Sequence, residues 1–264
     1  MRILYSTACL AGARDQAAAI EQLRSADLAP LEAGPLAGDL ERPAAEAGIA
    51  AAHLAFLPAR SARCNLAAAD DDLRGQAVKA ISEALARCEW LGIPVYGVEA
   101  GWNLTATLLD HGTPVGAPGR RPHALAQLER SLDRLADRAL ERGLSLLVAT
   151  MGPASGGLLA GPGEVRQVLG TVGAPNLAVA IDMEAWEAAA RLAAPRFDPD
   201  AAACDLGSIV GALRLPVRGK PERWHVAVAA ALGDARLVLV GGAAGVSPLR
   251  DGGARLREAL HAPA

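Results

Sequence analysis

Short apolar runs alternate with longer segments of helical period along the chain, and this alternation constrains the fold more than any other feature. The runs lie at 2–6, 30–33, 49–57, 94–100, 144–149, 177–182, 208–213 and 236–240. Strands separated by helical segments are typical of βα units around a parallel sheet. Eight such units are the number found in a (β/α)8 TIM barrel. The sequence therefore predicts an α/β fold, a single-domain TIM barrel over residues 1–264.

The helical segments support this interpretation. The clearest is 122–142, where Leu125, Leu128 and Leu132 share one face and Gly143 ends the helix. Further helices are predicted at 15–28, from the acidic triplet 70–72 to Gly92, at 164–169, at 184–192, at 221–232 and within 249–260. A doubly wound open sheet is the alternative, but no GxGxxG motif follows the first strand.

Charge and composition favour a small-molecule ligand. The net charge of -3 and the pI near 6.0 do not favour binding to nucleic acid or to an anionic membrane. The four cysteines have neither CxxC nor His-Cys spacing, which argues against zinc and fits a reducing cytoplasm. We expect a cytoplasmic protein, because Met1–Tyr5 begins as a strand and no apolar run reaches the roughly 18 residues of a membrane span. A homodimer is left open.

Three stretches resemble the xylose isomerase-like barrel family of sugar phosphate isomerases and epimerases. The first runs from Arg63 to Gly101 and contains Asn65-Leu66, Asp70, Arg74, Trp90-Leu91-Gly92 and Val98-Glu99-Ala100-Gly101. The second is 132–150, a helix, a glycine and a strand. The third is 175–182, a strand that ends in Asp182. The resemblance implies a barrel with its site at the C-terminal ends of the strands.

The resemblance also implies a metal site, since metal-dependent members hold a divalent cation with two Glu, an Asp and a His. Asp182 matches that Asp. Elsewhere the ligand types are replaced: Glu99 stands where a His is expected, Ala149 where a Glu is expected and Ala185 where a His is expected. We therefore expect no cofactor. The alternative is a relocated divalent metal site built from the carboxylates of Glu32, Glu99, Asp182 and Glu184, which lacks an imidazole.

Carboxylates at strand ends suit acid/base chemistry beside a carbonyl group, which needs one group to remove a proton and another to return it. The candidates are Glu99, expected as the base, together with Asp182 and Glu32. Each has a plainer interpretation. Glu99 would pair with an arginine such as Arg214, Asp182 would cap a helix, and Glu32 would be a solvated loop charge.

Other residues near strand ends are candidates for substrate binding. Aromatic rings there stack on ligands and polar groups orient them, although the same tryptophans also suit a barrel core. These candidates are Trp102, Asn103, Glu184, Trp186, Arg214, His225 and Tyr5.

The leading functional hypothesis is a small-molecule isomerase or epimerase-like enzyme, metal-independent, acting on a sugar-like or carbonyl-containing substrate. Two alternatives remain at this point. One is a catalytically inactive barrel that binds a ligand or a partner. The other is a metal-free lyase or cyclase of secondary metabolism, because one barrel supports many chemistries.

Overall fold

The fold is known from a computed structural model of the chain. The residues that it describes are 3–6, 16–33, 46, 48–53, 65–102, 108–110, 113–115, 121–151, 157–192, 197–216, 236–240 and 246–261.

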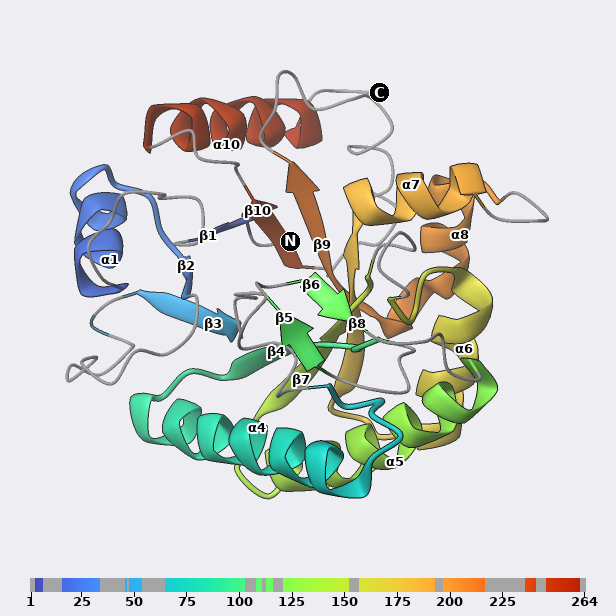
Figure 1. Cartoon of the computed structure of the whole chain (residues 1–264). Helices are drawn as coiled ribbons and strands as arrows, with labels where there is room; N and C mark the ends of the chain where they lie inside the picture. The colour runs from blue at the N-terminus through green and yellow to red at the C-terminus, as the bar shows by residue number, and fades with distance from the viewer. Residues whose placement is uncertain are drawn as a thin grey trace.

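Eight parallel strands close into a barrel, which confirms the predicted fold class (Figure 1). The strands are β1 (Ile3–Ser6), β2 (Leu31–Ala33), β3 (Ile49–His53), β4 (Val95–Glu99), β7 (Ser145–Ala149), β8 (Leu177–Asp182), β9 (Val210–Pro216) and β10 (Arg236–Val240). Around the ring the order is β1-β10-β9-β8-β7-β4-β3-β2. The first and last barrel strands in the sequence are thus neighbours, and the sheet has no free edge.

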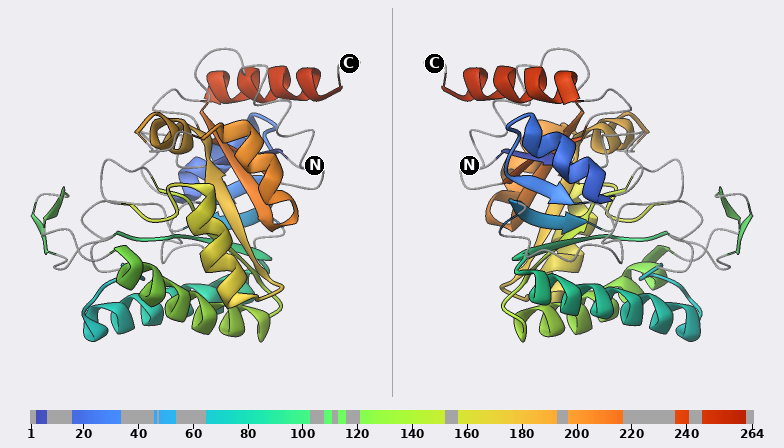
Figure 2. Two further views of the ribbon diagram at one scale, coloured as in Figure 1. Left: turned by 90° about the vertical axis from the view of Figure 1, so that its right-hand side faces the viewer. Right: turned by 90° about the vertical axis from the view of Figure 1, so that its left-hand side faces the viewer.

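Helices surround the strands in Figure 1. They are α1 (Gln16–Ser25), α4 (Asp71–Leu91), α5 (Arg121–Leu140), α6 (Pro162–Val172), α7 (Met183–Leu192), α8 (Pro199–Leu206), the 3-10 turn η4 (Gly207–Ile209) and α10 (Val246–His261). The short antiparallel strands β5 (Leu108–Asp110) and β6 (Thr113–Val115) form a hairpin that stands apart from the barrel in Figure 2. No helix in the described ranges is long and apolar enough to cross a membrane.

Strand residues alternate between two separate cores. The small inner core consists of Leu4, Ala50, Val95, Leu147, Ala149, Ala180 and Ala212, with Ala178 packed against it. The larger outer core joins the strands to the helices and includes Tyr96, Val148, Val179 and Leu213. Because side chains along a strand point alternately to opposite faces, β1, β3, β4, β7, β8 and β9 contribute described residues to both cores. The alternation therefore decides which strand residues face the interior of the barrel.

Local sequence explains the helix boundaries. Asp70 accepts hydrogen bonds from the N–H groups of Asp72 and Leu73 at the start of α4, and Gly92, with φ 68°, ends it. The inner face of α5 is fully buried at Leu128, Leu132 and Leu135. α5 packs between α4 and α6, so these three helices cover the side of the barrel formed by β4, β7 and β8.

The last helix approaches the first strand very closely. A Cβ added to Gly253 of α10 would lie 2.4 Å from the hydroxyl oxygen of Tyr5, so only glycine fits there. Arg257 donates a hydrogen bond to the same hydroxyl. Because Tyr5 lies between the inner-core residue Leu4 and Ser6, its ring points outward to α10. The candidate site therefore excludes Tyr5, contrary to the sequence-based prediction.

All eight predicted barrel strands are present, with boundary differences that have local causes. β9 begins at Val210 rather than at 208, because the turn Gly207–Ile209 precedes it. α6 extends over Pro162–Val172 and is longer than the predicted 164–169. The residues 54–57 of the third predicted strand and the predicted helix 221–232 lie outside the described residues.

Candidate functional site

Glu99 is the last residue of β4, and it lies in the row that faces the barrel interior. Val95 belongs to the inner core, so the residues two and four positions later, Gly97 and Glu99, face the same way. Glu99 is partly buried, and it neighbours Ala149 in the parallel pairing of β4 with β7. Burial raises the pKa of Glu99 to about 9, the nearby Asp182 adds to this rise, and Arg214 opposes it.

Asp182 is the last residue of β8 and continues the inner row of Ala178 and Ala180. Its carboxylate oxygen Oδ1 accepts a hydrogen bond from the N–H of Ala185 at 3.0 Å, so it also caps α7, as the plainer interpretation predicted. Its own N–H donates to Oγ1 of the buried Thr150 at 3.0 Å. One contact fixes the carboxyl group of Asp182, and the other fixes its backbone N–H.

Two opposing influences act on Asp182. Burial raises the pKa of its carboxyl group, and Glu184 raises it further, while the Ala185 N–H and the charge of Arg214 lower it. Glu99 accepts no hydrogen bond within the described part of the chain. Hydrogen bonds to the anion favour ionisation, so the Ala185 N–H favours the anion of Asp182, and Glu99 lacks a bond of this kind among the described residues.

Arg214 completes a group of three ionisable residues at this end of the barrel. It continues the inner row of Ala212 on β9 and pairs in register with Asp182. Its positive charge lowers the pKa of both Glu99 and Asp182. The expected association of Glu99 with Arg214 is thus present, and the same arginine serves Asp182 as well.

A single alanine lies between the strands that carry the two carboxyl groups. Ala149 on β7 separates β4 from β8 in the sheet and is nearly fully buried. A side chain that ends at Cβ leaves the carboxyl groups of Glu99 and Asp182 close enough to influence each other. A longer side chain at position 149 would extend into the space between the two carboxyl groups.

Asn65 holds the backbone directly after β4, a role that the sequence analysis missed. Its Oδ1 accepts hydrogen bonds from the N–H groups of Trp102 and Ala67, and its Nδ2 donates to the carbonyl of Trp102, each at 3.1 Å. A Cβ on Gly101, with φ 91°, would lie 2.3 Å from Oδ1. The buried amide thus positions the segment that leaves Glu99, and the signal for it in the sequence was a polar residue within the first stretch that resembles the family.

The two candidate tryptophans are largely structural. The ring of Trp186 is completely buried, its Nε1 donates to the carbonyl of Leu159 at 3.3 Å, and its edge contacts Phe197. A ring held in this way has no surface for a ligand, so the expectation of stacking by Trp186 is corrected. Trp102 is also buried and forms an isolated bridge with Gly157. It belongs to the core that joins the strands to the helices, which supports the plainer interpretation of a structural role.

The remaining candidates do not join the group. Glu184 lies exposed in the first turn of α7; its charge raises the pKa of Asp182, and a hydrogen bond from its backbone lowers it. Glu32 pairs with Ser6 in the backbone register of β2 with β1, but its side chain lies outside what is described. Asn103 and His225 lie outside the described residues. The structure therefore brings together Glu99, Asp182 and Arg214.

Comparison with protein families identifies the fold group. The sequence profile described as "Xylose isomerase-like TIM barrel" matches residues 17–205, which include β2 to β8 and the two carboxylates. The chain belongs to this family. The resemblance noted in the sequence is thereby confirmed. No curated protein matches the chain at a significant level.

Solved structures of similar fold include several sugar epimerases. A D-psicose 3-epimerase from Clostridium cellulolyticum H10, solved with D-tagatose, has a TM-score of 0.70 at 16% identity and covers 98% of this chain and 96% of its own. A D-tagatose 3-epimerase-like protein has a TM-score of 0.76 at 13% identity, covering 98% and 97%. A 3-keto-D-glucoside 4-epimerase from E. coli has a TM-score of 0.72 at 14% identity, covering 97% and 99%. At these identities the likeness shows the fold.

These findings contradict the prediction that no cofactor is needed. The neighbours are sugar epimerases, typically metal-dependent proteins, of the family to which the chain belongs, so membership gives no ground for expecting a cofactor-free chain. The described residues do not themselves supply a complete ligand set, because no three His, Cys, Asp or Glu side chains among them gather around a common point. Glu99 and Asp182 alone do not fit the four-ligand pattern of the metal-dependent members.

Proposed function

We propose that the chain is an isomerase or epimerase-like enzyme that moves a proton at a carbon beside the carbonyl group of a small, sugar-like substrate. The observation that carries this proposal is the pair of inward-facing carboxyl groups, Glu99 and Asp182, at the C-terminal ends of β4 and β8. In TIM barrels catalytic residues come from the ends of several strands at this face. The sugar epimerases among the solved neighbours support the same reaction class.

The two carboxyl groups take different roles at neutral pH. Glu99, whose pKa is raised to about 9, keeps its proton and acts as the acid. Asp182, stabilised as an anion by the Ala185 N–H and by Arg214, acts as the base. This reverses the sequence-based expectation that Glu99 is the base. The physical reason is the burial of Glu99 without a hydrogen bond to its carboxyl group in the described part of the chain.

In the proposed reaction Asp182 removes the proton from the carbon beside the carbonyl. Electrons of the broken C–H bond move to the carbonyl oxygen, and the positive charge of Arg214 stabilises the resulting enolate. Glu99 then donates its proton to the opposite face of the same carbon, which inverts the configuration. One turnover leaves Asp182 protonated and Glu99 ionised, and proton exchange with water restores the starting state.

A catalytically inactive binding barrel is the second candidate function. Ala149 and Ala185 favour it, because the resemblance in the sequence implies a metal ligand at each of these two positions and alanine cannot supply one. Arg214 and the carboxyl pair would then orient a polar ligand without reacting with it. An enzyme forms a product from its ligand and an inactive binding barrel does not, so product formation distinguishes the two functions.

We expect the purified chain to convert a ketohexose into its epimer. Ketohexoses and ketopentoses are incubated with the protein, and the products are resolved by carbon-13 NMR, with manganese, with magnesium and after chelation. New sugar signals that rise in proportion to protein concentration support the enzyme. Binding of a ketose by calorimetry with no product under any of the three conditions would instead support the inactive barrel.

Three further features remain predictions. They are a single domain over residues 1–264, a homodimeric state and a cytoplasmic location.

A further inference from the structure

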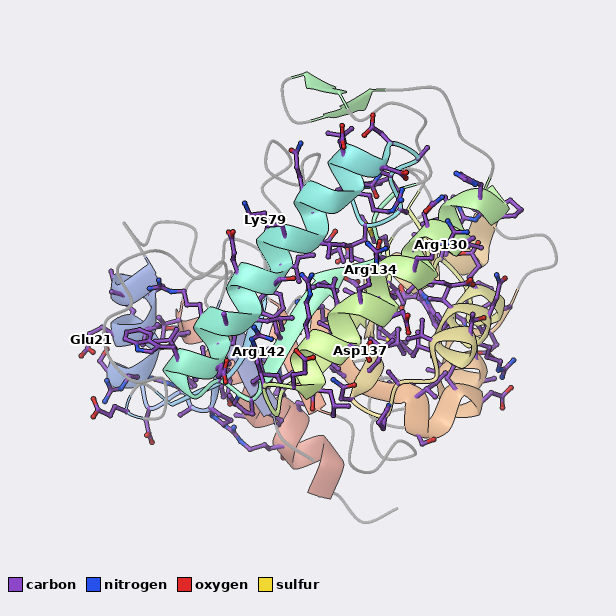
Figure 3. The ribbon with its side chains drawn as sticks, turned by 90° about the horizontal axis from the view of Figure 1, so that it is seen from below. Glu21, Lys79, Arg130, Arg134, Asp137 and Arg142 are labelled. Carbon is purple, nitrogen blue, oxygen red and sulfur yellow. The ribbon has the colours of Figure 1, made fainter. Side chains whose placement is uncertain are left out.

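Four arginines follow one another at intervals of four residues along α5 and just beyond it: Arg130, Arg134, Arg138 and Arg142. This spacing places them on one side of the helix. Figure 3 shows Arg130, Arg134 and Arg142 along the stretch where α5 lies beside α4. The row lies on the outside of the barrel, away from the strand interior that holds the carboxyl pair.

The two arginines at the C-terminal end of this row have partners. Arg138 donates a hydrogen bond to the hydroxyl of Ser82 on α4. Arg142 lies 3.4 Å from a carboxylate oxygen of Glu89 and donates to the carbonyl of Arg138 at 2.8 Å. These contacts join α5 to α4 and explain why cations occupy those two positions.

The two arginines at the N-terminal end differ. Among the described residues, neither Arg130 nor Arg134 has a hydrogen bond or ion pair through its side chain. Both act on Asp71 through their charge alone. Like charges four residues apart on a helix destabilise it by a few tenths of a kcal/mol. The charge of Asp71 is the opposing charge that acts on this pair, and neither guanidinium group is held by a hydrogen bond among the described residues.

Arg130 and Arg134 line a cavity of about 320 Å³ between the two helices. The other lining residues are Asp71, Arg74, Gly75, Val78 and Ser131. Three arginines against one aspartate give the lining a formal charge of +2. The volume is at the lower end of the range for small-molecule sites and exceeds what a bare anion needs.

Arg74 is already fixed in this cavity. It donates one hydrogen bond to the carbonyl of Ala68 at 2.8 Å and one to the carboxylate of Asp71. A guanidinium group has five N–H donors, so further donors remain for a ligand. Gly75 leaves the groove open, because a Cβ added there would meet no atom within 4 Å.

We propose that the groove formed by Arg74, Gly75, Val78, Arg130 and Arg134 binds the phosphate group of a small phosphomonoester. A phosphomonoester carries a charge of about -1.5 to -2 at neutral pH, which matches the lining. Guanidinium groups bind phosphate oxygens in bidentate geometry, and three of them converge here. Val78 offers an apolar wall for the organic part. The site is separate from the carboxyl pair and does not depend on the proposed reaction.

Calorimetry at low ionic strength tests this site with glycerol phosphate and inorganic phosphate as probes. The wild-type protein is expected to bind glycerol phosphate more tightly than inorganic phosphate. The double variant Arg130→Ala/Arg134→Ala is expected to weaken binding at least tenfold. Its matched control is Arg24→Ala/Arg191→Ala, which removes two exposed arginines elsewhere, changes the net charge equally and should retain affinity within about twofold.

A second pair of variants guards against a general loss of structure. Gly75→Glu places a carboxylate in the groove beside the arginines and should abolish binding, whereas Gly75→Ala should retain it. Both replacements favour the helix over glycine, so α4 is expected to remain folded. The proposal is overturned if the wild type fails to bind glycerol phosphate at millimolar concentration, if the ester gives no gain over inorganic phosphate, or if the control variants lose binding equally.

Discussion

Replacement of Asp182 by asparagine is expected to lower kcat for the proposed epimerisation by about 10²- to 10⁴-fold, the usual contribution of a positioned acid or base. Asparagine retains a side-chain oxygen in the place that accepts the Ala185 N–H, and it is a good N-cap residue. The start of α7 should therefore stay intact. What the variant loses is the ability to take a proton.

The fold provides a matched control for this variant. Asp198 caps α8 through hydrogen bonds from the N–H groups of Asp200 and Ala201, at 2.9 and 3.2 Å, and it is exposed. Asp198→Asn makes the same chemical change at a helix cap without an inward-facing carboxylate. It should leave kcat within about twofold of wild type. Equal activity of the Asp182 and Asp198 variants would reduce Asp182 to a cap.

The second large effect concerns stability rather than turnover. Burial raises the pKa of Glu99 from 4.5 to about 9, so the folded state holds a proton that the unfolded state releases above pH 4.5. The stability that depends on this proton is complete below pH 4.5 and is lost as the pH rises through 9. Glu99→Gln cannot ionise. It is expected to unfold at the same denaturant concentration as wild type near pH 4 and to be more stable by about 2 to 3 kcal/mol at pH 7.

Urea unfolding at intervals from pH 4 to pH 9 measures this difference. Glu21→Gln on the exposed surface of α1 is the control, and its stability relative to wild type should vary little across the range. A gap between wild type and Glu99→Gln that stays constant with pH would mean that Glu99 ionises normally in the folded protein. The acid role assigned to Glu99 would then fail with it.

Short apolar runs were sufficient to predict the barrel strands, because a parallel strand that is covered on both faces is a nearly continuous apolar run. Hydrophobic patterns were insufficient to predict the shortest strands and helices. The hairpin β5–β6 has strands of three residues, too short for a period to emerge. The helix α8 was missed although Asp198 and Pro199 supply a cap and a proline at the first helical position.

The candidate site was predicted in part. Glu99 and Asp182 could be found from position, since the last residue of a barrel strand lies at the functional face. Tyr5 was assigned wrongly because a shift of one residue along a strand changes which face of the sheet a side chain takes, and the sequence does not show that shift. Trp186 was assigned wrongly because the burial of its ring depends on how α7 packs against Leu159 and Phe197. The roles of acid and base required burial and hydrogen bonds, which only the folded arrangement supplies. The four-residue spacing of the arginines was visible in the sequence but was not noticed.

The most direct test of the carboxyl pair is solvent deuterium incorporation early in the reaction. A ketose that the protein converts is incubated in D₂O, and proton NMR is recorded before a tenth of it has reacted. Two carboxyl groups on opposite faces predict one deuterium at the inverted carbon of the product and none in the remaining substrate, because Asp182 keeps the removed proton while Glu99 delivers a deuteron. Deuterium in the remaining substrate, or a product without deuterium, would contradict the account.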